Sequence, residues 1–242
     1  MKNIARILIL ALSQGLGLTA SLQGVTLIDQ IGDPTTFELA DSVFPNVSQI
    51  FSDFPAFDSL VLEDFEIDGE DLTVRSVQVL FFAQNGFASF DLVSEYRLGF
   101  FDDPSLASDS LLGNVASVSL PSLSEQVIVS RVGEGASGLV TLLGEWELPE
   151  SGQYWVGVAP VAANSVAGQF FLANGGEGAM AGGANGIFVN PDEGFGQGTS
   201  QDVATDFAVL VSTERIPEPN TVVFVSFFAV LGLCSRRRKK AV

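Results

Sequence analysis

The sequence predicts an all-β fold, with a β-sandwich or jelly roll as its body. Two observations predict it: apolar residues recur with a period of two in several short stretches, and clusters of Gly, Pro, Asn and Asp separate those stretches. No long stretch of the body has helical spacing. Twenty phenylalanines supply large core side chains that need no hydrogen-bond partner. Many short strands joined by turns are typical of sandwiches and jelly rolls.

The N-terminus has the three parts of a secretory signal peptide. Lys2 and Arg6 form a basic start, residues 7–12 (ILILAL) begin an apolar core, and the small residues 19–21 follow it. The alternative is a buried N-terminal helix. We expect a signal peptide helix over residues 1–22, removed on export.

The body that follows contains four clear strand patterns. They are residues 77–82, 127–132, 154–158 and 207–211. Turn signals lie between them at Asp68-Gly69, Asn85-Gly86, Asp102-Asp103-Pro104 and Gly133-Glu134-Gly135. Residues 43–57, rich in Phe, Pro and Ser, predict an irregular loop. Residues 174–198 contain nine glycines and predict a long loop that encloses one strand around residues 186–190.

The C-terminus ends in an apolar run and a basic block. Thr221 to Cys234 is a charge-free run of fourteen residues, about 21 Å as a helix at ~1.5 Å per residue, which with its flanks suits a short membrane span. The basic residues after it are typical of a stop signal on the cytoplasmic side: Arg236, Arg237, Arg238, Lys239 and Lys240. The alternative is a core helix with a basic tail. We expect a transmembrane helix with the body outside.

Pro217, Glu218 and Pro219 stand just before that run. Two prolines two apart favour an extended backbone, which suits a processing enzyme that grips a strand. Motif, apolar helix and basic end together resemble the PEP-CTERM sorting signal of Gram-negative bacteria. The resemblance implies recognition by an exosortase after export through the Sec translocon. It divides the chain into a signal peptide (1–22), an ectodomain (23–213) and a sorting segment (214–240).

Charge and composition exclude several functions for the body. The chain has a formal charge of −18, and residues 24–220 hold all 29 acidic but only four basic residues, a charge of −25. Such a body repels phosphates, so we expect no nucleic-acid partner. There is no histidine, and the one cysteine is Cys234 in the apolar run. A Ser–His–Asp or Cys–His site is therefore excluded from the mature body, and the usual zinc sites are disfavoured.

The body has a second, looser resemblance. Glu63-Asp64-Phe65, residues 96–103 and residues 152–156 (GQYWV) are similar to strands of jelly-roll repeat domains in anchored bacterial surface proteins, and Asp206-Phe207-Ala208 to their last strand. That family has no assigned catalysis. The resemblance implies the fold and the location.

A few residues are candidates for ligand chemistry. Asp64, Glu66 and Asp68 resemble the start of a calcium loop, but the twelfth position is Arg75, so the EF-hand pattern fails and a looser calcium site on a sandwich edge remains the hypothesis. The alternative is an acidic strand and turn with one face in water. Asp102-Asp103 is likewise either part of a calcium site or an ordinary turn. Trp146, Tyr154 and Trp155 are candidates for stacking on sugars. By strand alternation, one ring of the Tyr154-Trp155 pair faces the core and the other the surface.

These observations predict an exported, non-enzymatic protein of the cell surface or of an exopolysaccharide-associated extracellular matrix. It passes through an inner-membrane intermediate, held by its C-terminal helix, before an exosortase processes it. The alternative is a jelly-roll carbohydrate-binding module at the cell surface, with or without calcium, and with a polysaccharide as its partner. We expect no other cofactor. A glycosidase needs a cleft with one raised carboxyl pKa, and the sequence singles out no carboxylate pair for that role.

Overall fold

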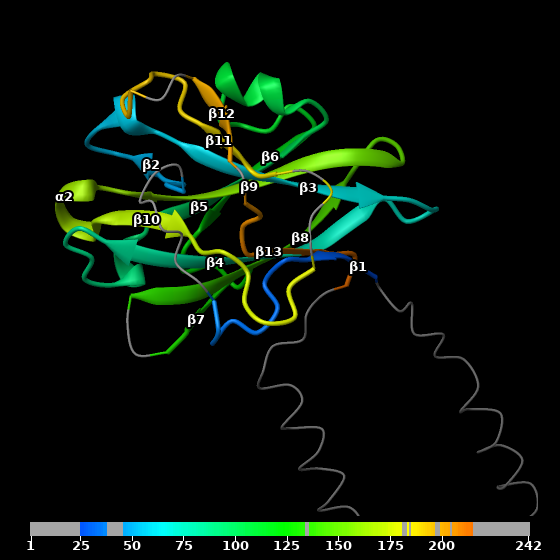
Figure 1. Cartoon of the computed structure of the whole chain (residues 1–242), viewed down its shortest axis with the longest axis horizontal. Coiled ribbons are helices and arrows are strands. Elements are labelled where there is room, and N and C mark those ends of the chain that lie inside the picture. Colours follow the sequence, from blue (N-terminus) through cyan, green and yellow to red (C-terminus); the bar gives the residue numbers. More distant parts are fainter. Residues whose placement is uncertain are drawn as a thin grey trace, which may run out of the picture.

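The computed structural model describes residues 25–37, 46–133, 136–180, 183, 185–196, 199–203 and 205–214. These residues form an all-β protein with two sheets that lie one above the other in Figure 1. The predicted signal peptide (1–22) and the predicted sorting segment (214–240) lie outside the described residues, apart from Glu214. No helix in the described part of the chain is long and apolar enough to span a bilayer.

The first sheet is built around the long strand β4 (Thr73–Gln84). Its spatial order is β1 (Thr26–Asp29), β13 (Val209–Ser212), β4, β8 (Ser137–Glu147) and β7 (Val127–Arg131). β13 and β10 (Gln169–Leu172) pair with the same edge of β4. β13 pairs with the first half of β4, and β10 pairs with the second half. All pairings in this sheet are antiparallel.

The second sheet is built around β9 (Gly152–Ala162). Its order is β12 (Ser200–Asp202), β11 (Ile187–Val189), β3 (Leu60–Ile67), β9, β5 (Glu95–Phe101) and β6 (Ala116–Pro121). The two-residue strand β2 (Ile50–Phe51) pairs in parallel with the end of β9. The other pairings described for this sheet are antiparallel. In the described part of the chain, four helices of three to five residues interrupt the strands: η1 (Pro55–Phe57), η2 (Phe90–Leu92), η3 (Pro104–Ser108) and α2 (Asn164–Ala167).

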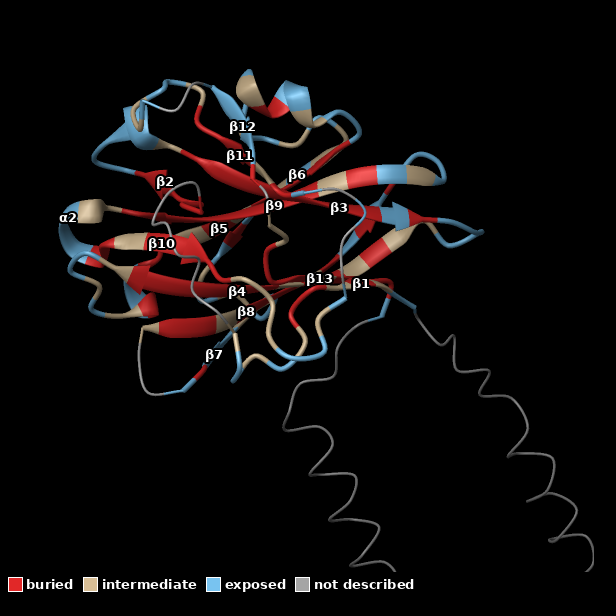
Figure 2. Cartoon of the chain, viewed as in Figure 1, coloured by how far each residue is buried: buried red, intermediate tan, exposed pale blue. Residues whose placement is uncertain are grey.

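The main core lies between the two sheets, as the buried colouring of the facing strands shows in Figure 2. In β4, the inward side chains Val77, Val79 and Phe81 are fully buried, because side chains two apart on a strand share a face. In β3, Val61 and Phe65 belong to this core. Every second side chain of β3 therefore points between the sheets, and Glu63 shares their face.

The opposite face of the second sheet is also apolar. Leu60 and Leu62 of β3 pack there with Phe101, Ala107 and Val189 in a second, smaller cluster. The second sheet is therefore covered on both faces. This explains why its strands contain runs of apolar residues as well as alternating ones.

The strand predictions for the body are confirmed. Residues 77–82 lie in β4 and 154–158 in β9, while 127–132 and 207–211 overlap β7 and β13. The strand expected inside the glycine-rich stretch is β11. The turn at Asn85-Gly86 has φ angles of 54° and 94°, the left-handed values that Asn and Gly tolerate best. From residue 46 on, the loop predicted over 43–57 contains only isolated bridges, β2 and η1.

Candidate ligand-binding site

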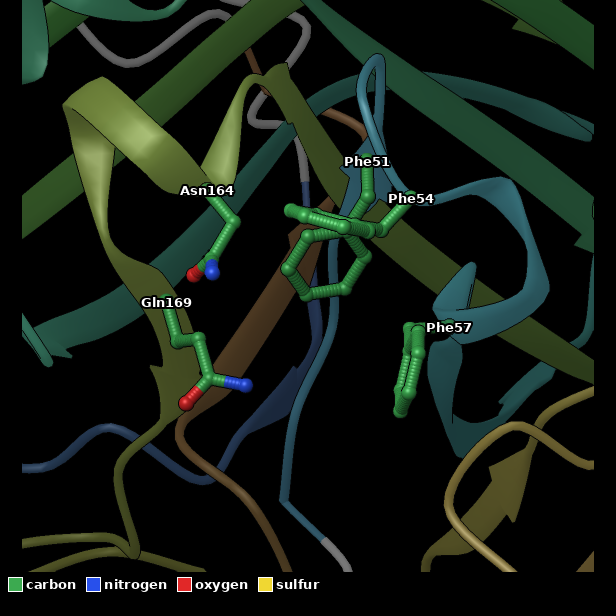
Figure 3. A pocket seen from close by; sticks show the side chains of 5 residues that line it. All are labelled: Phe51, Phe54, Phe57, Asn164 and Gln169. Carbon is green, nitrogen blue, oxygen red and sulfur yellow. The ribbon is translucent and has the colours of Figure 1, made fainter.

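The aromatic pocket is a surface hollow beside the end of β9, with a volume of about 250 Å³. Its lining comprises Phe51, Phe54, Phe57, Asn164 and Gln169. Figure 3 shows the two amide side chains on one side, Phe57 on the other, and the rings of Phe51 and Phe54 between them. The three rings come from one short loop, while Asn164 is the first residue of α2 and Gln169 the first residue of β10.

The segment with the three rings, residues 51–57, is called the phenylalanine loop, and it takes its shape from a turn around Pro55. Pro55 occupies the first turn of η1, where a missing backbone N–H costs nothing. After the turn, the Asp58 carboxylate accepts a hydrogen bond of 2.6 Å from the backbone N–H of Phe51. The loop therefore closes on itself, and Phe54 and Phe57 remain 49% and 37% exposed.

A buried asparagine braces this loop from beneath. The side-chain amide of Asn190, which is fully buried, donates to Asp58 O at 2.8 Å and to Ala56 O at 3.2 Å. Its Oδ1 accepts from the N–H of Phe195 at 3.1 Å. The Phe195 ring in turn packs edge-on against Phe57, with ring centroids 5.1 Å apart. The exposed rings are thus carried by a fixed backbone, which is the arrangement expected of a preformed binding site.

A buried glutamine joins the two walls of the pocket. The side-chain amide of Gln49 donates to Ala162 O at 3.3 Å and Gly168 O at 3.2 Å, while its Oε1 accepts from Phe170 N at 2.9 Å. Since Gln49 directly precedes β2, these bonds hold the start of the phenylalanine loop against both ends of α2. The Asp53 carboxylate adds bonds from the loop to the N–H groups of Asn164 and Ser165, at 2.8 and 3.0 Å.

The two amides of the pocket differ in their hydrogen bonding. Gln169 accepts through Oε1 from the Asn85 side chain, which leaves its NH₂ group as a donor. The side-chain Oδ1 of Asn164 is buried and has no hydrogen-bond partner among the described residues. An unsatisfied buried carbonyl costs about 1–3 kcal/mol, so this amide is suited to accept a hydrogen bond from a ligand.

The electrostatics of the pocket are mildly negative. None of its lining residues is charged, and the nearest carboxylates described above are Asp53 and Asp58. Burial raises the pKa of Asp58, although the Phe51 N–H and the charge of Arg97 both act to lower it. The pocket therefore combines an uncharged lining, apolar rings and hydrogen-bonding amides.

The predicted calcium residues are not gathered into one site. Asp64 is buried and its Oδ2 accepts from the Gln153 side chain at 2.9 Å, whereas Glu66 is exposed. Asp68 is exposed in the turn, where its Oδ1 accepts from the N–H of Gly69. Among the described residues, no three acidic or cysteine side chains form a group that could hold a metal ion.

Asp102 and Asp103, the second acidic candidate, shape the segment that follows β5. Asp102 accepts from the side chain of Asn114, and Asp103 accepts from Ser105 N at the start of η3. These bonds are those of an ordinary turn and helix cap.

The predicted sugar-stacking residues lie mostly in the core. Trp146 and Tyr154 are buried, and Trp155 is half-buried on the opposite face of β9 from Tyr154, as strand alternation predicts. The exposed aromatic residues that form a pocket are Phe54 and Phe57, which the sequence analysis did not single out. The available signal was three phenylalanines around Pro55 in a segment without strand periodicity.

A buried carboxyl lies apart from the pocket, between the sheets. Glu63 is 1% exposed, and its Oε1 accepts from Phe207 N at 2.7 Å while Oε2 has no partner among the described residues. Burial raises the pKa of Glu63 well above its usual range; the Phe207 N–H opposes this and nearby Asp206 adds to it. The carboxylate of Asp64 adds to this shift as well, and the side chain of Gln30 acts against it.

The fold and site together define an all-β protein of two packed sheets with an aromatic pocket on its surface. Comparison of the chain with protein-family models, curated proteins and solved structures finds no match.

Proposed function

We propose that this chain is an exported, non-enzymatic protein of the cell surface or extracellular matrix, sorted at Pro217-Glu218-Pro219 by an exosortase. The signal-peptide pattern, the proline motif, the apolar run and the block Arg236 to Lys240 support the proposal from the sequence. The strongly acidic body is consistent with a soluble cargo outside the cell.

The observation that carries the proposal is the position of the two ends of the described body. β1 and β13 are antiparallel neighbours (Figure 1). In this pair Thr26 lies opposite Ser212. Beyond that pair, Thr213 N donates to Val25 O at 3.0 Å, and Arg75 donates to Thr213 O at 3.1 Å. The predicted signal peptide and the predicted sorting segment would therefore both be attached to the body where β1 pairs with β13. Their removal would break no described strand.

The sorting step is tested by replacing Glu218 with Ala in the producing cell. We expect the Glu218→Ala chain to accumulate in the membrane with its tail uncut, since the motif is what the processing enzyme is proposed to recognise. Glu214→Ala, which removes the same charge just outside the motif, is the control and should be processed normally. Mass spectrometry of both ends of the native protein gives the result, and an intact 242-residue chain in the cytosol would overturn the proposal.

The second candidate function is a jelly-roll carbohydrate-binding module at the same location. The aromatic pocket favours it, because exposed rings beside amides suit sugars. The jelly-roll relation is supported by three of the segments that carry the resemblance, which lie in the adjacent strands β3, β9 and β5. Glycan-array binding with and without a chelator separates this function, and its calcium-assisted form, from the first. No binding, together with an unchanged Tm on adding calcium, would leave the first function alone.

A further inference from the structure

We propose that the aromatic pocket binds one unit of a neutral saccharide. The sugar packs a C–H face on Phe54 and Phe57 and places hydroxyl groups at the amides of Asn164 and Gln169. This inference rests on the second candidate function and names its site, its residues and its class of ligand.

The exposed rings supply the apolar half of the site. Phe54 and Phe57 are the aromatic members of the exposed large apolar side chains in the described body, and both belong to the same pocket. The face of an aromatic ring carries partial negative charge, so it attracts the polarised C–H groups of a pyranose. The brace formed by Asn190 holds the two rings in place before binding, which reduces the entropy lost when the ligand orders them.

The amides supply the polar half. A hydroxyl group both donates and accepts, so it can accept from the NH₂ of Gln169. It can also donate to Asn164 Oδ1, which is buried in this structure, once that side chain turns toward the pocket. A purely apolar ligand, such as a lipid chain, would cover the NH₂ of Gln169 without bonding it and would incur the desolvation cost of that group. The mixed lining therefore favours a sugar over a lipid.

Charge and size restrict the ligand further. The lining contains no cation, and the carboxylates of Asp53 and Asp58 lie beside it, so uronic acids and phosphates are repelled. The volume of about 250 Å³ lies below the ~300–1,000 Å³ of sites for larger ligands. One sugar unit, at a chain end or along a chain, fits this volume.

The test uses the full-length chain in lipid nanodiscs, with empty nanodiscs as the blank. A glycan array of neutral and uronic-acid oligosaccharides first identifies a binder, and calorimetry then measures its affinity. We expect at least one neutral oligosaccharide to bind and its uronic-acid counterpart not to bind. Phe54→Ala should weaken binding tenfold or more, because it removes the central exposed ring.

Leu112→Ala is the matched control, since Leu112 is 50% exposed and outside the pocket lining. It should leave affinity unchanged, and equal Tm values for both variants would show that each is folded. The proposal is overturned if no neutral saccharide binds, if uronic acids bind as well as neutral ones, or if binding survives Phe54→Ala. The last result would leave a carbohydrate-binding function at another site, and none of the three changes the terminal masses that test sorting.

Discussion

The phenylalanine loop and the site around Glu63 depart in opposite ways from the usual pattern, in which apolar side chains are buried and charged ones are exposed. In the loop, apolar rings face solvent, whereas at Glu63 a carboxyl and the amide of Gln30 lie almost wholly buried. The loop gains its order from hydrogen bonds to its backbone, made by Asn190 beneath it. Glu63 is satisfied at one oxygen only, by the N–H of Phe207.

This difference predicts that changes near Glu63 affect mainly stability, whereas changes to the exposed rings affect mainly ligand binding. A ring that stays half exposed after folding buries less surface than a core ring and contributes less to stability, so changes to it should act mainly on the ligand. A buried carboxyl contributes directly to the free energy of unfolding, because its ionised form is poorly solvated in the core. Variants of the two sites should therefore change different measurements, and a residue that serves both should change both.

Asn190 is the exception, because we expect its replacement to lower both stability and saccharide affinity. Among the variants discussed, it should also lower stability the most. Asn190→Ala removes three hydrogen bonds from a fully buried position. It leaves Asp58 O and the N–H of Phe195 without these bonds, while Ala56 O keeps the bond from Gly194 N at 3.0 Å. We expect a loss of about 2–4 kcal/mol in the free energy of unfolding, measured by urea titration. Saccharide affinity should fall as well, because the loop loses its brace.

Asn114→Ala is the control for that prediction. Asn114 is an exposed asparagine that bonds the Asp102 carboxylate, so its removal should change stability by about 0.5 kcal/mol or less. A similar loss in both variants would mean that the brace has no special role.

The sequence predicted what local pattern determines. The strands at residues 77–82 and 154–158 alternate over a single stretch, so their period is visible without any partner. The alternation also correctly separated Tyr154 from Trp155. Both predictions depend on the geometry of one strand and on nothing else in the fold.

The pocket could not be predicted in this way, because its walls are more than 100 residues apart. Gln49 connects them through carbonyls at Ala162 and Gly168, a contact that depends on the parallel pairing of β2 with β9. The calcium hypothesis met a related difficulty. The spacing of Asp64 and Glu66 correctly implies one face of a strand, but it does not reveal that Gln153 already bonds the first of them.

Glu63→Gln should have the second-largest effect, and it should depend on pH. Between the ordinary value of 4.5 and its raised pKa in the fold, Glu63 is ionised when unfolded and protonated when folded. Unfolding therefore releases a proton, and the stability of the native chain falls as pH rises through this window. The glutamine variant lacks this loss and should be more stable at pH 8 by about 1–3 kcal/mol, but not at pH 4.

Glu66→Gln is the control on the same strand, where the side chain is exposed. Urea titrations at pH 4 and pH 8 should show no pH-dependent difference between this variant and the native chain. If Glu63→Gln behaved in the same way, the carboxyl would be ionised in the fold and the contrast between the two sites would be lost.

Asn164→Ala should have the smallest effect on stability. It gives the clearest test of whether ligand binding can change while stability does not. It removes a buried carbonyl that has no partner, and alanine is the better helix former, so the free energy of unfolding should stay constant or rise by up to about 1 kcal/mol. Saccharide affinity should nevertheless fall severalfold, because a ligand hydroxyl loses its acceptor. Val166→Ala, at an exposed position of the same helix, should change neither quantity by much. A loss of stability in Asn164→Ala would instead show that its amide serves the fold.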